Sequence, residues 1–315
     1  MISGMEYRKL GRTGLSISAL SFGASSLGGV FREVDEGDCI RTVHVSLDKG
    51  INFIDTSPFY GLTKSEAVLG KALKSVPRDR YILATKVGRY GWEMKDFDFS
   101  ANRVTASVDE SLKRIGVNYA DVIYAHDIEF GDLDQVIQET IPALRKVQKA
   151  GKARFVGVTG LPLKAIRRVV EAVPIDVVLS YCHFGLNDTA LLEMVPMLKS
   201  RGVGIINASP LGMGLLSTRE MPNWHLAPAE LKEICARAAA HCRARGASIE
   251  KLAIQYALTK PEIATTLVGS ADPAEMENNI QWAGEPIDRQ LLDEVLAILK
   301  PVHNLTWRSG RPENN

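Results

Sequence analysis

The sequence predicts a (β/α)₈ TIM barrel with an N-terminal hairpin and extra helices, formed by residues 1–315 as a single domain. Short apolar runs typical of strands alternate with helical patterns eight times, and no linker or low-complexity segment interrupts them. This alternation predicts a parallel sheet with helical crossovers. Eight units favour closure into a barrel, and 315 residues suit one barrel of this kind.

The elements are expected in a regular order. A hairpin is expected over residues 6–18, with its turn at the sequence GRTG, residues 11–14. The eight barrel strands are expected at residues 19–22, 51–54, 81–85, 121–125, 154–159, 176–180, 204–207 and 264–268. Helices are expected at residues 36–49, 65–74, 102–115, 133–150, 162–172, 188–200, 228–245, 248–258, 273–282 and 288–299. Ser65 is expected to be the N-cap of the second helix.

An open, doubly wound sheet is the alternative to a barrel. That fold commonly carries a GxGxxG turn after its first strand. Residues 23–28 of this chain instead read GASSLG, which is not that fingerprint. The barrel is therefore the favoured prediction.

Composition excludes several classes of partner. A net charge of +1 offers no electrostatic basis for binding nucleic acid or an anionic membrane. No apolar segment approaches the roughly 18 residues that a membrane span needs. Four cysteines in a chain of this length predict no disulfide framework, and we expect a cytoplasmic location. Cys235, His241 and Cys242 share one predicted helix without a second pair of ligands, so no metal site is expected.

Polar residues stand at the ends of three successive predicted strands. Asp55 and Tyr60 follow the second strand, Lys86 ends the third, and His126 ends the fourth. In a barrel these ends face one mouth, so the four side chains can meet in one pocket. An acid, a phenol, an ammonium and an imidazole together support proton transfer at a hydroxyl or carbonyl. We expect Lys86 to lower the pKa of the Tyr60 phenol from its usual value near 10.

Each of these residues also has a simpler interpretation. Asp55 and Lys86 could form a structural ion pair, Tyr60 could be a packing aromatic, and His126 could be a hydrogen-bonded polar residue. Their joint position on three strand ends favours a catalytic site. Because this set of side chains cannot accept a hydride, the site implies a cofactor.

The four residues, with their spacing, resemble the catalytic tetrad of the aldo-keto reductase superfamily. The sequences LGRTGL at 10–15, SPLG at 209–212 and GS at 269–270 resemble that superfamily too. FIDTSPFYG, ATKVGRY, SYCHFGLND and NLTWRSG are similar to its sugar dehydrogenases that act on L-galactose. This resemblance implies oxidation of the C1 hydroxyl of L-galactose, or of a close relative such as L-fucose, to the lactone with NAD.

The resemblance also implies the cofactor contacts. They are Gly23, Ala24, Ser25, Asp55, Thr159, Ser180, Ser209, Pro210, Leu211, Gly212, Gly214, Gly269, Ser270, Glu275 and Asn279. The chain departs from the common reductase pattern at Thr159-Gly160, Val178 and Ala208, which changes how a nicotinamide would be held. Glu275 would repel a 2′-phosphate and could accept a hydrogen bond from a ribose hydroxyl, so NAD is expected over NADP. Backbone N–H groups from Gly269 to the start of the next helix are expected to bind a phosphate.

Four residues are expected to face the substrate: Tyr60, His126, Trp92 and Trp307. Both tryptophans could instead form a hydrophobic lid without substrate contact. The expected partner is a small sugar, and the expected assembly is a monomer or weak homodimer. The alternatives are an NADPH-dependent reductase of aldehydes or ketones and a non-catalytic, cofactor-sensing binding module.

Overall fold

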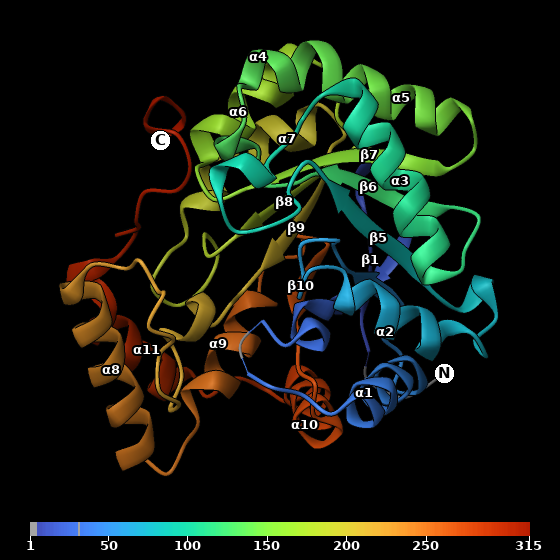
Figure 1. The fold of residues 1–315 in the computed structure, drawn as a ribbon. Helices are drawn as coiled ribbons and strands as arrows, with labels where there is room; N and C mark the ends of the chain where they lie inside the picture. The colour runs from blue at the N-terminus through green and yellow to red at the C-terminus, as the bar shows by residue number, and fades with distance from the viewer. Residues whose placement is uncertain (1–4, 31) are drawn as a thin grey trace.

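A closed barrel of eight parallel strands forms the centre of the protein, as the sequence predicts (Figure 1). The computed structural model describes residues 5–30 and 32–315. Neighbouring strands around the barrel follow the order β10-β3-β4-β5-β6-β7-β8-β9. The strands are β3 Leu20–Gly23, β4 Phe53–Asp55, β5 Ile82–Val87, β6 Ala120–Ala125, β7 Ala153–Gly160, β8 Val177–Tyr181, β9 Gly204–Ala208 and β10 Thr265–Val268.

The predicted N-terminal hairpin is present and closes the bottom of the barrel. Strands β1 (Tyr7–Lys9) and β2 (Ser16–Ser18) pair in antiparallel fashion. Leu10 and Ile17, which flank the turn, are fully buried and belong to the same apolar cluster as Phe53 inside the barrel. The hairpin therefore plugs the end of the barrel that receives the N-terminal ends of the strands.

Helices surround the barrel, and two extra helices lie outside this ring (Figure 1). The helices are α1 Glu36–Asp48, α2 Lys64–Leu73, α3 Ala101–Ile115, α4 Leu133–Gln135, α5 Ile141–Lys149, α6 Leu163–Ala172, α7 Val195–Ser200, α8 Ala229–Ala244, α9 Ile249–Ala257, α10 Pro273–Gly284 and α11 Arg289–Leu299. The extra pair, α8 and α11, packs side by side and shares an apolar cluster that includes Leu231, Leu291 and Val295.

Two predicted helices are interrupted in the structure. The helix expected over residues 133–150 contains a π-helical turn, Val136–Thr140, before α5 begins. Pro142 follows this turn, and it has no N–H group to donate to the carbonyl four residues earlier. The helix expected over residues 188–200 begins as a 3₁₀ turn, Ala190–Glu193, and Pro196 stands in the first turn of α7. In both places a proline marks the point where regular α-helix begins.

The prediction that Ser65 caps α2 is wrong. The helix already includes Lys64, and Ser65 is buried inside its first turn. Its hydroxyl donates to the Ala24 carbonyl oxygen at 2.7 Å and lies 2.9 Å from the Thr56 hydroxyl. Ser65 therefore joins α2 to the ends of β3 and β4 rather than capping its own helix.

Alternation along the strands decides which side chains reach the mouth of the barrel. Phe53, Ala84 and Val122 belong to the apolar cluster inside the barrel. The next residue in each strand (Ile54, Thr85 and Ile123) faces the surrounding helices, since successive side chains point to opposite faces. Positions two residues beyond an inward residue point inward again. On β4, β5 and the end of β6, those positions bring Asp55, Lys86 and His126 to the axis.

Glu66 on α2 ties the helix layer to the barrel. Its carboxylate is fully buried, accepts a hydrogen bond from Thr85 Oγ1 at 2.7 Å, and pairs with Arg114 Nε on α3 at 2.9 Å. Arg114 is the positive partner of Glu66, and its side chain is 24% exposed.

We therefore expect Arg114→Ala to destabilise the protein by about 3 kcal/mol, because it leaves a buried carboxylate without its counterion. The exposed pair Lys71–Glu36 provides the control, with side chains 57% and 48% exposed. Lys71→Ala should change the free energy of unfolding by less than about 1 kcal/mol. Urea denaturation of both variants checks this, and equal effects would contradict it.

Candidate active site

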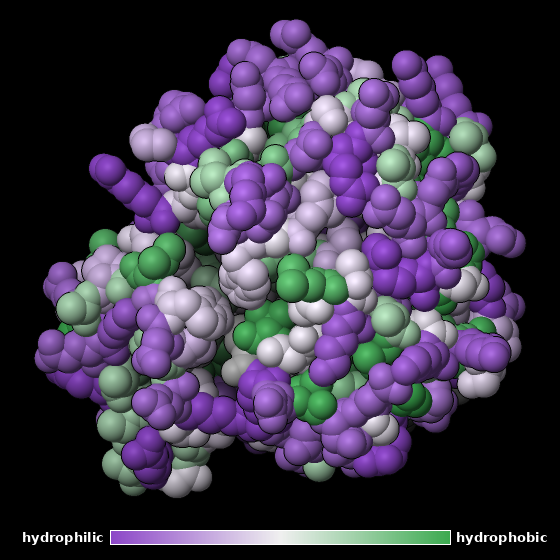
Figure 2. Space-filling model, viewed as in Figure 1, coloured by the Kyte–Doolittle hydropathy of each residue, from purple (hydrophilic) through white to green (hydrophobic). Residues whose placement is uncertain are grey.

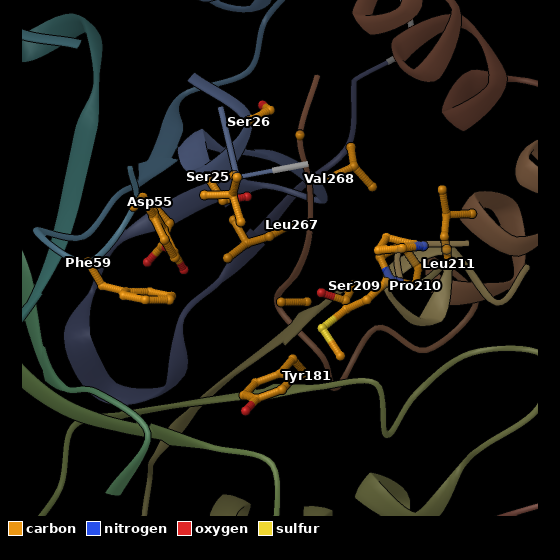
Figure 3. Close-up of a pocket in the computed structure, with 18 of the residues that line it drawn as sticks. Ser25, Ser26, Asp55, Phe59, Tyr181, Ser209, Pro210, Leu211, Leu267 and Val268 are labelled. Atoms are coloured by element: carbon orange, nitrogen blue, oxygen red, sulfur yellow. The ribbon is translucent and has the colours of Figure 1, made fainter. Parts of the chain in front are cut away.

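A cavity of about 750 Å³ opens at the C-terminal ends of the barrel strands. Apolar residues gather near the centre of the face shown in Figure 2, surrounded by polar ones. Figure 3 shows Asp55 and Phe59 from the β4 side of the cavity, Tyr181 from β8, and Ser209 and Pro210 after β9. All four predicted catalytic residues, Asp55, Tyr60, Lys86 and His126, line this cavity.

The Lys86 ammonium group is the centre of the hydrogen-bond network. Its side chain is 1% exposed, and its nitrogen donates to an Asp55 carboxylate oxygen, to the Thr56 carbonyl oxygen at 2.8 Å and to the Tyr60 hydroxyl at 3.1 Å. These three contacts use all three N–H donors of the ammonium group. The network therefore fixes the distance between Lys86 and the Tyr60 oxygen.

The ionisation of this network differs from the expectation. The pKa of Tyr60 is raised, because burial of the phenol outweighs the attraction between its anion and Lys86. Burial also raises the pKa of Asp55. Burial by itself would lower the pKa of Lys86, but Asp55 and Tyr60 together raise it by a larger amount. The pKa of Lys86 is therefore above its usual value, and the side chain is an ammonium at neutral pH. The prediction that Lys86 brings the Tyr60 pKa below its usual value is wrong for the protein alone: Lys86 only limits the rise.

His126 is neutral and held in one orientation. Its pKa is lowered to about 3, chiefly because the imidazole is buried, with Lys86 and Arg89 opposing its protonation and Asp127 favouring it. Its Nδ1 lies 3.1 Å from the Ser57 hydroxyl, which also accepts the backbone N–H of Phe59. When the Ser57 hydroxyl donates to Nδ1, the ring proton is on Nε2, which lies 3.5 Å from Asp127 Oδ2. His126 can therefore donate a hydrogen bond without carrying charge.

An ion pair that sequence reasoning missed lies beside His126. Arg89 Nη1 is 2.5 Å from Asp127 Oδ2, and both residues line the cavity. The Arg89 guanidinium also covers the Phe59 ring, with its central carbon 3.6 Å from the ring centroid. Asp127 is buried and has a positive φ of 50°. Its backbone N–H donates to Thr159 Oγ1 at 3.0 Å, and the Thr159 hydroxyl donates to Asp127 Oδ1 at 3.4 Å. The sequence signal that could have identified Asp127 is its position directly after His126, at the end of a barrel strand.

Tyr181 and Glu129 are further buried polar residues that the sequence analysis did not select. Tyr181 lines the cavity and donates a hydrogen bond to Glu129 Oε1 at 3.3 Å. Strand alternation could have identified Tyr181, because Val177 and Leu179 of the same strand face the barrel interior. Glu129 follows His126 closely in sequence, but nothing in its spacing indicates burial.

The predicted cofactor contacts fall into two groups. Most line the cavity: Gly23, Ser25, Asp55, Thr159, Ser209, Pro210, Leu211, Gly214, Gly269, Ser270, Glu275 and Asn279. Ala24, Ser180 and Gly212 are buried and do not line it, so a contact between these three residues and a cofactor stays a prediction. Ser180 alternates with the inward residues of β8 and so faces the helix layer. The Gly212 carbonyl oxygen forms a hydrogen bond with His225 Nε2 at 2.8 Å.

The turn between β10 and α10 also differs from the expectation. The Asp272 side chain accepts hydrogen bonds from the N–H groups of Ala274 and Glu275, so these two donors are not available to a phosphate. Glu275 pairs with Arg32 at 3.3 Å and with Arg219, and accepts a hydrogen bond from the Ser270 hydroxyl at 2.7 Å. Its pKa is lowered, since these contacts outweigh burial, and the side chain is a carboxylate at neutral pH.

Both tryptophans expected near the substrate line the cavity. Trp92 is 57% exposed, and its ring meets Phe59 edge-on with the ring centroids 4.7 Å apart. Trp307 makes an edge contact with His225, with the centroids 4.9 Å apart. They belong to different loops, so both can bound the mouth of the cavity.

Residues 5–30 and 32–315 contain no helix that is long and apolar enough to cross a membrane. The same residues contain no group of three or more His, Cys, Asp or Glu side chains arranged to hold a metal ion.

Comparison with known proteins identifies the family. Residues 19–300 match the Aldo/keto reductase family. The chain is 52% identical to L-galactose dehydrogenase of Arabidopsis thaliana over 98% of its own length and 99% of that protein's. It is 30% identical to D-threo-aldose 1-dehydrogenase of a Pseudomonas species, covering 90% of this chain and 94% of the relative. An aldo-keto reductase structure from Bacillus halodurans, in its holo form, superposes with a TM-score of 0.77 at 27% identity, covering 97% and 98% of the two chains. The chain therefore belongs to the aldo/keto reductase family.

Proposed function

We propose that the protein oxidises the C1 hydroxyl of L-galactose, or of a close relative such as L-fucose, to the lactone, with NAD⁺ as cofactor. The observation that carries this proposal is the Tyr60–Lys86–Asp55 network, which faces a cavity large enough for a sugar and a dinucleotide. The 52% identity to L-galactose dehydrogenase of Arabidopsis over nearly both chains supports the choice of sugar.

The residues around the cavity suit a dinucleotide. The cavity extends from Tyr60 to Asn279 on α10. Asp55 Oδ2 and Ser26 Oγ are buried without a hydrogen-bond partner among the described residues, although both side chains lie beside the cavity. Buried polar atoms are normally paired, so these two fit the polar groups of a bound ligand. We propose that Ser25, Ser209, Ser270 and Asn279 contribute further contacts. When bound, NAD⁺ supplies the acceptor for the hydride that leaves C1.

The side chains of the tetrad perform the proton chemistry. Tyr60, in its phenolate form, accepts the proton of the C1 hydroxyl as the C–H bond breaks and the C1–O bond gains double-bond character. Lys86 stabilises this phenolate before it accepts the proton, and Asp55 holds Lys86 in place. His126 donates its Nε2–H to the substrate oxygen. Because His126 is neutral at physiological pH, it orients the oxygen without competing for the proton.

Glu275 supports a preference for NAD. Its carboxylate lies at the end of the cavity beside α10 and would repel a 2′-phosphate. Arg32 and Arg219 could attract such a phosphate, but both are engaged by Glu275. An NADPH-dependent aldehyde reductase remains the competing function within the family. A cofactor-sensing module would retain the cavity but would not need the intact proton network.

NADH formation should be fastest, by kcat/KM, with L-galactose or L-fucose in a panel that also contains D-arabinose and L-glucose. The absorbance of NADH measures this directly. NADPH-dependent reduction of aldehydes without oxidation of any sugar in the panel would contradict the proposal.

Tyr60→Phe should lower kcat by about 10²–10⁴-fold, because the proton acceptor is lost while the cavity keeps its shape. NAD binding, followed by quenching of protein fluorescence, should remain unchanged. Tyr119→Phe is the control, since Tyr119 precedes β6 at the opposite end of the barrel and should keep full activity. Residual activity of Tyr60→Phe above a few per cent would refute the role of Tyr60.

Glu275→Gln should strengthen NADP binding by about tenfold, or about 1.4 kcal/mol, because it frees two arginines and removes a negative charge. Wild-type protein should bind NAD more tightly than NADP in the same fluorescence titration. Glu277→Gln on the same helix is the matched control, since Glu277 pairs with the exposed Lys49. Tighter binding of NADP than NAD by the wild type would overturn the assigned preference.

A further inference from the structure

The C-terminal segment, residues 303–315, crosses from the outer helices to the far side of the barrel mouth. It follows α11 and ends beside α6 (Figure 1). Trp307 and Ser309 from this segment line the cavity. At its end, Lys164 on α6 donates hydrogen bonds to the carbonyl oxygens of Glu313 and Asn315. The segment therefore forms part of the cavity wall.

Glu129 is one of the residues to which this segment is attached, and it makes contacts with both its backbone and its side chain. Its backbone carbonyl accepts the N–H of Arg311 at 2.9 Å and the Asn314 side-chain amide at 2.8 Å. Its carboxyl oxygen Oε1 accepts three hydrogen bonds, from Ser309 Oγ at 2.9 Å, Leu161 N at 3.2 Å and Tyr181 OH at 3.3 Å. One side chain thus connects the C-terminal segment, β8 and the end of β7.

Two glycines allow this close approach. Gly310 has a φ of 73°, and a Cβ atom there would lie 2.4 Å from the Glu129 carbonyl oxygen. A Cβ atom on Gly160 would lie 2.7 Å from Glu129 Oε2. At position 160 the missing side chain leaves the space that the carboxyl group of Glu129 occupies.

The surroundings of Glu129 favour its neutral acid. The residue is fully buried, and its Oε2 has no hydrogen-bond partner among the described residues. No cation pairs with the carboxyl group in the part of the chain that the structure describes. Burial first, and then the nearby Asp127 carboxylate, raise its pKa to about 8. A carboxylate at this position would be buried without a counterion.

We propose that Glu129, as a protonated carboxylic acid, latches residues 303–315 onto the barrel and so holds the Trp307–Ser309 wall of the sugar pocket. Glu129 does not line the cavity and acts as a positioning residue, through Ser309 and Tyr181. The effect on sugar binding rests on the proposed function, whereas the latch itself does not.

The direction of the pH dependence follows from the groups that face Glu129. Asp127 opposes its ionisation from the same loop, and the Tyr181 phenol and Ser309 hydroxyl donate to it from β8 and the C-terminal segment. The nearby Arg89 is paired with Asp127, and the Arg311 side chain donates to the Phe130 carbonyl. When the latch opens, Glu129 regains an ordinary pKa. Latching is therefore strongest below about pH 4.5, weakens as the pH rises, and levels off above about pH 8.

Hydrogen–deuterium exchange of residues 303–315 in the full-length protein, without sugar, tests the latch. Protection factors, which remove the intrinsic pH dependence of exchange, should fall at least about tenfold between pH 5.5 and pH 8.5 in the wild type. In Glu129→Gln they should stay constant, and at pH 8.5 they should exceed those of the wild type. The KM for the sugar should rise with pH in the wild type and stay flat in this variant.

Two further variants separate the effect of Glu129 on exchange from that of other groups in the segment. Glu313→Gln removes an exposed carboxylate of the same segment and should reproduce the wild-type pH dependence. Ser309→Ala should lower protection about fivefold at pH 5.5, because one hydrogen bond is lost. The proposal is overturned if wild-type protection is constant over this pH range or if Glu129→Gln loses protection as the wild type does. Failure of the protein to oxidise any sugar would remove the KM readout but leave the exchange result intact.

Discussion

The buried ion pair between Lys86 and Asp55 is the interaction on which the rest of the site depends. A charged lysine 1% exposed is tolerated only if its charge is neutralised and its N–H groups are satisfied. Asp55 meets the first requirement, and the Thr56 carbonyl and Tyr60 hydroxyl complete the second. The same contacts fix the Tyr60 oxygen near a positive charge. The chemistry of the site therefore follows from the way a buried cation is stabilised.

The barrel places this pair without help from the loops. The strands β4, β5 and β6 have inward residues at every second position. Asp55 and Lys86 are the last inward positions of β4 and β5, and His126 is the first inward position after β6 ends at Ala125. Tyr60 is the exception, since it comes from a turn after β4, and Lys86 connects it to the strand residues. Rigid strands hold the charged groups, while the loop supplies the group that exchanges a proton.

Two buried acids near the mouth of the cavity have pKa values shifted in opposite directions. Asp127 has Arg89 as a counterion, and this ion pair favours the anion, so the pKa of Asp127 is lowered despite burial. Glu129 lies two residues later, has no such partner among the described residues, and has a raised pKa. A paired anion borders the cavity, and a neutral acid anchors the wall behind it. Neighbouring residues of one short loop thus divide into a charged group and an uncharged group because only one of them meets a cation.

Sequence alone determined the barrel, the hairpin and the meeting of Asp55, Tyr60, Lys86 and His126, because hydrophobic periodicity and strand-end position are local properties of the chain. Tertiary structure decided the rest. The raised pKa of Tyr60 depends on how completely the phenol is buried, and Ser180 faces away from the cavity because of the exact register of β8. The engagement of Glu275 by Arg32 and Arg219, and of Glu129 by Ser309, joins residues more than 50 positions apart. Such pairings depend on side-chain contacts across the folded molecule, which no local pattern encodes.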